Sequence, residues 1–147
     1  MTQTNIESIE RQNNGLEQLK YAINTWGSKG SKQWRKEVIA FNAVLLYFPE
    51  DRASCAKALS GLTEIYAYYL RDYRRAIIEA DIIQSQYADQ REELSHALLK
   101  KAYAYMMLKD FDNAKKSYQV VLDAFKDFEK DREASLTGIE RINHMER

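Results

Sequence analysis

The residue types that carry most enzyme chemistry are few in this chain and lie far apart. His96 and His144 are the only histidines, and they fall on different predicted helices. Ser60 and Ser95 are available hydroxyl nucleophiles, but no strained nucleophile turn surrounds either of them. General acid–base or nucleophilic catalysis needs such groups to converge on one reacting atom. The sequence therefore predicts no catalytic residues and no enzyme activity.

Metal and cofactor sites are equally hard to assemble from these residues. Cys55 is the only cysteine, and the chain has no HExxH motif and no cluster of carboxylates with histidine. The glycine- and lysine-containing stretch 27–32 lacks the GxxxxGK[ST] spacing of a phosphate-binding loop. We interpret it as a polar linker and expect no metal and no cofactor.

Composition limits the fold and the class of partner. Of 147 residues, 45% are apolar and 30% charged, with one Pro and only five Gly, which favours one mostly helical domain. The formal net charge is zero, whereas nucleic-acid binders usually carry a basic excess. No stretch is long and apolar enough to cross a bilayer, and no apolar signal core begins the chain. With a single cysteine, these features favour a cytoplasmic protein without membrane insertion.

Apolar residues recur every three or four positions over most of the chain, which is the helical period. The pattern predicts one helix over about residues 5–26, with the alternative of a short arm before a helix capped at Asn14, because Glu17 follows three residues later. The remaining predicted helices cover the ranges 33–48, 52–70, 73–87, 90–109, 110–125 and 127–145.

The predicted helices form pairs that repeat. Phe48, Tyr87 and Phe125 each close the second helix of a pair and lie at nearly equal intervals. Tyr66-Ala67-Tyr68 recurs as Tyr103-Ala104-Tyr105, and the turn after Leu70 recurs after Leu108. The interval falls within the range of about 20–50 residues that is typical of solenoids, in which stacked units bury each other's apolar faces.

The best copy resembles the tetratricopeptide repeat. Leu98, Ala102 and Tyr105 match the large, small and aromatic positions of its first helix, and Ala114 with Tyr118 matches its second helix. The resemblance implies a right-handed all-α solenoid of helical hairpins, with about three pairs and a capping helix. The corresponding ranges are 5–48 for a divergent first pair, 52–87 and 90–126 for the repeats, and 127–147 for the capping helix.

The resemblance also implies a function, since such repeats serve mainly as protein-binding scaffolds. The first helix of each pair lines the concave face, which implies a groove of aromatic, apolar and Met residues for a peptide or helix of another protein. The predicted groove residues are Leu59, Leu62, Tyr66, Tyr69, His96, Leu99, Tyr103 and Met106. An equally weighted alternative is that the N-terminal or final helix covers this stripe.

The leading hypothesis is thus a non-enzymatic adaptor, co-chaperone or assembly scaffold whose partner is another protein. One alternative is a structural solenoid that self-assembles into homo-oligomers through its end repeats. Another is a regulatory or small-ligand-binding helical subunit of a larger complex, which a deep closed apolar pocket would favour.

Overall fold

The structure, a computed structural model, describes residues 9–26 and 33–147. Within these residues every regular element is helical and no strand occurs, which confirms the all-α part of the predicted fold class. The α-helices are α2 (Gly15–Trp26), α3 (Trp34–Tyr47), α4 (Arg52–Glu64), α5 (Tyr73–Gln86), α6 (Arg91–Met107), α7 (Phe111–Ala124) and α8 (Glu129–Met145), and a π-helical turn, η2 (Ile65–Tyr69), continues α4.

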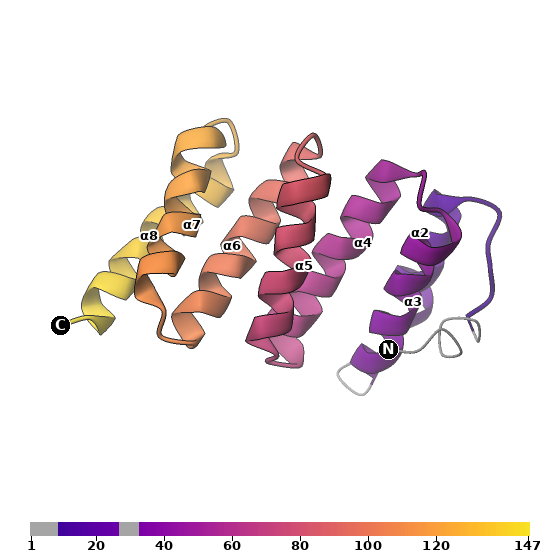
Figure 1. The fold of residues 1–147 in the computed structure, drawn as a ribbon, viewed down its shortest axis with the longest axis horizontal. Helices are drawn as coiled ribbons and strands as arrows, with labels where there is room; N and C mark the ends of the chain where they lie inside the picture. The colour runs from indigo at the N-terminus through magenta and orange to yellow at the C-terminus, as the bar shows by residue number, and fades with distance from the viewer. Residues whose placement is uncertain (1–8, 27–32) are drawn as a thin grey trace.

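The helices form a row that runs from α2 and α3 at one end to α8 at the other (Figure 1). Each helix contacts the next one along the chain. In addition, α4 contacts both α2 and α6, and α6 contacts α8. The even-numbered helices, which are the first members of the successive pairs, therefore lie beside one another and form one continuous face of the row.

The N-terminal helix begins later than expected. Residues 9–14 are not helical, and α2 begins at Gly15. The side-chain oxygen of Asn14 accepts a hydrogen bond from the Glu17 amide at 2.9 Å, so Asn14 caps the helix. The expectation of one continuous helix is wrong for residues 9–14, and the capped alternative is confirmed. Residues 5–8 of that predicted helix, and the predicted linker 27–32, lie outside the described residues.

Tertiary contacts explain why the chain turns before Gly15. A Cβ atom at Gly15 would lie 2.4 Å from a carboxylate oxygen of Asp51, so the start of α2 packs closely against the N-terminus of α4. The buried Gln18 side chain accepts from the Gln12 amide at 2.7 Å and donates to the Glu10 carbonyl at 3.1 Å. These bonds hold the preceding segment across the helix start.

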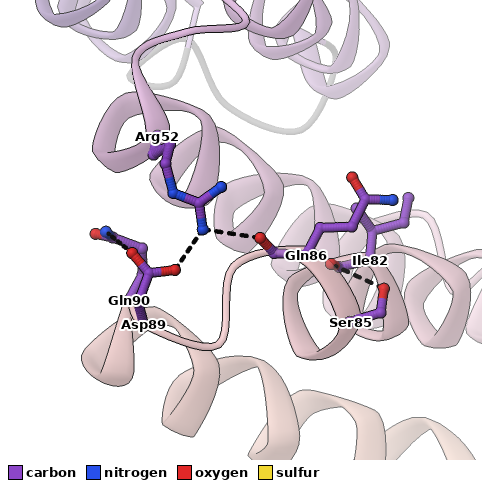
Figure 2. Close-up of polar contacts among 6 residues, drawn as sticks. All are labelled: Arg52, Ile82, Ser85, Gln86, Asp89 and Gln90. Atoms are coloured by element: carbon purple, nitrogen blue, oxygen red, sulfur yellow. Dashed lines mark hydrogen bonds and ion pairs between the residues drawn. The ribbon is translucent and has the colours of Figure 1, made fainter.

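An arginine at the first position of α4 joins this helix to the end of α5 (Figure 2). Arg52 donates to the Gln86 carbonyl at 2.8 Å and forms an ion pair with Asp89, and its guanidinium lies 4.9 Å from the Tyr87 ring centre. Asp89 also accepts from the Gln90 side chain at 3.0 Å. The contact ties successive helix pairs together.

The same contact recurs one repeat later. Arg91 begins α6, pairs with Asp127 at 2.8 Å, and lies 5.2 Å from the Phe125 ring centre. Because Arg52 and Arg91 make equivalent contacts, they occupy equivalent repeat positions. The interval between them therefore defines the structural register of the two repeats.

The register set by Arg52 and Arg91 aligns the rest of α4 with α6. It pairs Leu59 with Leu98, and both are buried. It also pairs Tyr66 with Tyr105. The Tyr66 carbonyl accepts a hydrogen bond from the Asp72 amide in the turn that follows, and the Tyr105 carbonyl accepts the equivalent bond from the Asp110 amide. Tyr66 is thus equivalent to Tyr105, and the sequence match of Tyr66 with Tyr103 is two positions out of register.

The π-helical turn is where the spacing changes. The Leu70 amide donates to the Ile65 carbonyl, five positions back, whereas the equivalent Leu108 donates to Ala104, four positions back. One extra residue is therefore accommodated within the last turn of the longer helix. After the π-helical turn, the interval between equivalent positions is one residue shorter. In this second register Arg71 is equivalent to Lys109, and the two residues have similar left-handed φ angles of 54° and 63°.

The best repeat packs as its small residues predict. Ala102 and Ala114 have no exposed surface and share a core cluster with Tyr118, while Tyr105 packs against the same cluster. Alanine at both positions lets the two helices approach closely. On α8, Ile142 completes this cluster.

Candidate functional site

A hollow of about 320 Å³ opens between the π-helical turn, α6, α7 and α8. We call it the C-terminal hollow. Its walls come from helices that are far apart in sequence but adjacent in the row. The lining residues are Tyr68, Leu99, Tyr103, Tyr118, Ala134, Thr137, Gly138 and Arg141.

Three tyrosines dominate this hollow. Tyr68 is 42% exposed, and its ring centre lies 4.9 Å from that of Tyr103. Tyr118 is buried, and burial raises the pKa of its hydroxyl. Tyrosines offer large apolar faces together with a hydrogen-bonding tip, a combination that is common where proteins bind one another.

Glycine provides the space in which Tyr118 lies. A Cβ atom at Gly138 would come within 2.3 Å of the Tyr118 ring, so the absence of a side chain lets the ring pack against the α8 backbone. One turn further along α8, Arg141 lines the same hollow and is exposed. It forms no ion pair with the described residues, so its guanidinium remains available to a carboxylate or carbonyl oxygen of a ligand.

The structure brings only part of the predicted groove together. Leu99 and Tyr103 line the C-terminal hollow. Leu59, Leu62 and Met106 are buried in the core and present almost no surface to a partner.

The other three predicted groove residues lie elsewhere. Tyr66 packs towards α5, with the Arg75 guanidinium 5.8 Å from its ring centre. Tyr69 is 49% exposed and stacks on Trp34 at 3.9 Å, at the far end of the face from α8. His96 lies 3.4 Å from Asp131.

The register shift explains these placements. In the register set by Arg52 and Arg91, the positions of α4 that match His96 and Tyr103 are the exposed Lys57 and Glu64, rather than a tyrosine stripe. The π-helical turn then brings Tyr68 against Tyr103.

Sequence reasoning missed Tyr68, Gly138 and Arg141 as site residues. Gly138 carried a readable signal, because glycine inside a predicted helix is unfavourable and often marks a close approach. The position of Tyr68 depends on the π-helical turn, for which the sequence contains no comparable signal.

The described residues contain no group of three His, Cys, Asp or Glu side chains placed to hold a metal ion. Cys55 is buried, its thiol contacts the Phe48 carbonyl at 3.3 Å, and burial raises its pKa, so it is a poor nucleophile. Among the helices described, none combines the length and the apolar character needed to cross a membrane.

Comparison of the chain with family models, with curated proteins and with solved structures finds no match in any of the three.

Proposed function

We propose that this protein is a non-enzymatic interaction module that binds a peptide or helix of another protein along the face formed by α4, α6 and α8. The observation that carries the proposal is the C-terminal hollow, in which Tyr68, Tyr103 and Tyr118 accompany an arginine that forms no ion pair with the described residues. Aromatic residues and Arg are the types most often found at the energetic centres of protein interfaces.

The repeated helix pairs support the same proposal. A tetratricopeptide-like solenoid presents the first helix of each pair on its concave side. In this chain the corresponding even-numbered helices lie next to one another, from α2 through α4 and α6 to α8. An extended segment or a helix that crosses these helices would contact the tyrosine rings of η2 and α6 and the guanidinium of Arg141.

The test is differential capture of partners with two double variants. Tyr68→Ala with Tyr103→Ala removes the aromatic wall, and Ile78→Ala with Val120→Ala removes exposed apolar side chains from α5 and α7 as a matched control. Proteins captured from source-cell lysate are identified by mass spectrometry. The tyrosine variant is expected to lose the partners that the wild-type and control chains retain.

Circular dichroism and thermal melting of both variants establish that they are folded. If the control variant loses the partners and the tyrosine variant keeps them, the binding surface lies on the odd-numbered helices and the proposal is wrong. Equal capture by all three chains also contradicts it.

A further inference from the structure

A second hollow, of about 450 Å³, lies at the opposite end of the row between α2, α3, α4 and η2. We call it the N-terminal hollow. Its lining is mostly apolar and aromatic but includes two carboxylates and one amine. The lining residues are Leu19, Ile23, Trp34, Glu37, Phe41, Lys57, Gly61, Glu64, Ile65 and Tyr69.

Two polar groups that line this hollow are buried and have no hydrogen-bond partner among the described residues. Glu37 is only 7% exposed, and its Oε2 atom contacts no donor. The indole Nε1–H of Trp34 likewise contacts no acceptor. Buried polar groups in folded proteins are nearly always paired, so two unpaired groups that line one hollow favour a polar or charged ligand there.

The Glu37 and Glu64 carboxylates define the charge that a ligand of this hollow would carry. Burial and the nearby Glu64 carboxylate raise the pKa of Glu37 to about 7. Burial and, to a smaller extent, the Glu64 charge thus make the ionised form of Glu37 unfavourable, and a cation placed at both carboxylates would stabilise that form. Lys57 also lines the hollow but is exposed and forms no ion pair with the described residues.

The remaining surface disfavours a simple metal ion and favours an organic cation. No third His, Cys, Asp or Glu joins the two carboxylates within the described part of the chain. The walls instead come from Leu19, Phe41 and Ile65, with the stacked rings of Trp34 and Tyr69 beside them. Such walls suit an alkyl chain.

We propose that the N-terminal hollow binds a primary alkylammonium group, with its nitrogen at Glu37 and Glu64 and its carbon chain against the apolar wall. The group comes either from a free amine or from a lysine side chain of a bound protein segment. The site is separate from the C-terminal hollow, so the proposal does not depend on the proposed function.

The test uses three probes of equal length, n-hexylamine, hexanol and hexanoate, titrated at about pH 8 by calorimetry. Trp34 fluorescence in a Trp26→Phe background gives a second readout. Hexylamine is expected to bind saturably and about tenfold or more tighter than either other probe, because only it makes a charge-assisted bond to a buried carboxylate. Equal binding of hexanol would show that the hollow accepts apolar chains only and would overturn the proposal.

Four variants locate the bound charge. Glu37→Gln keeps the side-chain shape and should abolish the preference for hexylamine, and Glu64→Gln should reduce it. Glu92→Gln, at an exposed position on α6, is the matched control and should bind like the wild type. Lys57→Met removes a like charge from the rim and should bind hexylamine at least as tightly.

Circular dichroism establishes that each variant is folded. Unchanged hexylamine affinity in Glu37→Gln, or weaker binding in Lys57→Met, contradicts the assignment. A final pair of probes distinguishes the two sources of the amine. Nα-acetyl-lysine-methylamide should bind and its Nε-acetylated form should not if lysine side chains fit the hollow, whereas binding of hexylamine alone assigns the site to free amines.

Discussion

The two hollows at the ends of the row are built on the same frame and differ in charge. Phe41 and Tyr118 hold the same position two repeats apart, as do Gly61 and Gly138, and each aromatic ring packs on its glycine. The same two-repeat interval relates Glu64 in the N-terminal hollow to Arg141 in the C-terminal one. The two ends thus share an aromatic ring that packs on a glycine. They differ in the charged residue beside it, which is Glu64 at one end and Arg141 at the other.

The middle repeat shows the reverse arrangement of sizes. Ala80 is the equivalent of Phe41 and Tyr118, and Lys100 is the equivalent of the two glycines. A small residue on the second helix thus accompanies a large one on the first helix. Lys100 is partly buried, and burial lowers the pKa of its amine. The middle repeat therefore has no glycine on which a ring could pack, and the two glycine-backed hollows lie at the ends of the face.

Buried carboxylates give a second contrast between the ends. Asp131 on α8 accepts from the Ser95 hydroxyl at 2.7 Å and lies 3.4 Å from His96. Glu37 on α3 is similarly buried, and one of its oxygens has no hydrogen-bond partner within the part of the chain that the structure describes. A partnered buried carboxylate stabilises helix packing, whereas an unpartnered one destabilises the fold unless something else binds it.

The largest expected effect is on the pH dependence of stability. The pKa of Glu37 is about 7 in the folded chain and 4.5 as the reference for the unfolded one. The folded protein therefore retains a proton that the unfolded chain releases, and stability falls as the pH rises through this interval. The full shift corresponds to roughly 3 kcal/mol between the two limits. Glu37→Gln should flatten this fall in urea unfolding measured at about pH 5 and pH 8.

Two comparisons make this prediction specific. Burial also raises the pKa of Glu79, so a weaker fall of stability with rising pH should remain in the Glu37→Gln variant.

Asp131→Ala should destabilise the protein by about 1–3 kcal/mol, because it leaves the buried Ser95 hydroxyl unpaired. An unaltered pH profile in Glu37→Gln would show that this carboxylate ionises normally and that the two ends do not differ in this respect.

A smaller effect is expected from filling the glycine beneath Tyr118. Gly138→Leu forces the ring away from the α8 backbone and should lower the free energy of unfolding by about 1–3 kcal/mol, as overpacking usually does. Thermal and urea unfolding give the value. Adding Tyr118→Ala should recover much of the loss, since Ala80 with Lys100 is the same combination of small and large residues.

This double-mutant cycle compares the outer and middle repeats directly. If the losses from Gly138→Leu and Tyr118→Ala simply add, the ring and the glycine are not coupled, and the equivalence drawn between the repeats fails.

The smallest effect is expected where the repeats do not differ. Lys109 has a φ of 63°, a left-handed conformation that costs most residues more than glycine. Lys109→Gly should stabilise the protein by up to about 1 kcal/mol, because the gain exceeds the extra entropy that glycine loses on folding. Arg71→Gly should behave alike in thermal melting. A lower melting temperature in both variants would mean that these side chains make contacts that outweigh their strain.

Much of the architecture could be predicted from the chain. The helical period places most helix ends close to those observed, where Asp51 and Asp110 cap α4 and α7. Ala102 and Ala114, which match the repeat in sequence, lie in the core, where their small side chains let two helices approach closely. The predicted N-terminal helix is too long because the apolar stripe keeps its phase across Asn14. In the structure, the Asn14 cap and the contact of Gly15 with Asp51 set the start of α2.

The candidate site could be predicted only in part. Leu99 and Tyr103 line one hollow, as their shared stripe predicts, because α6 is a regular helix whose faces follow from spacing alone. The predicted stripe on α4 does not share this surface, because the similar residues Tyr66 and Tyr103 are not at equivalent positions. Periodicity cannot distinguish a register error of two positions from the correct register when both stripes are apolar.

The sequence by itself determined that this protein is a series of paired helices, because helix period, caps and small residues act over a few neighbouring positions. Only the tertiary structure decided which side chains meet. The π-helical turn rotates the tyrosines that follow it, glycines admit rings from the previous helix, and Glu37 lies beside Glu64 although α3 and α4 are separate helices. A glycine within a predicted helix indicates a close approach, but which ring packs on it and which charges meet depend on contacts between residues far apart in the sequence.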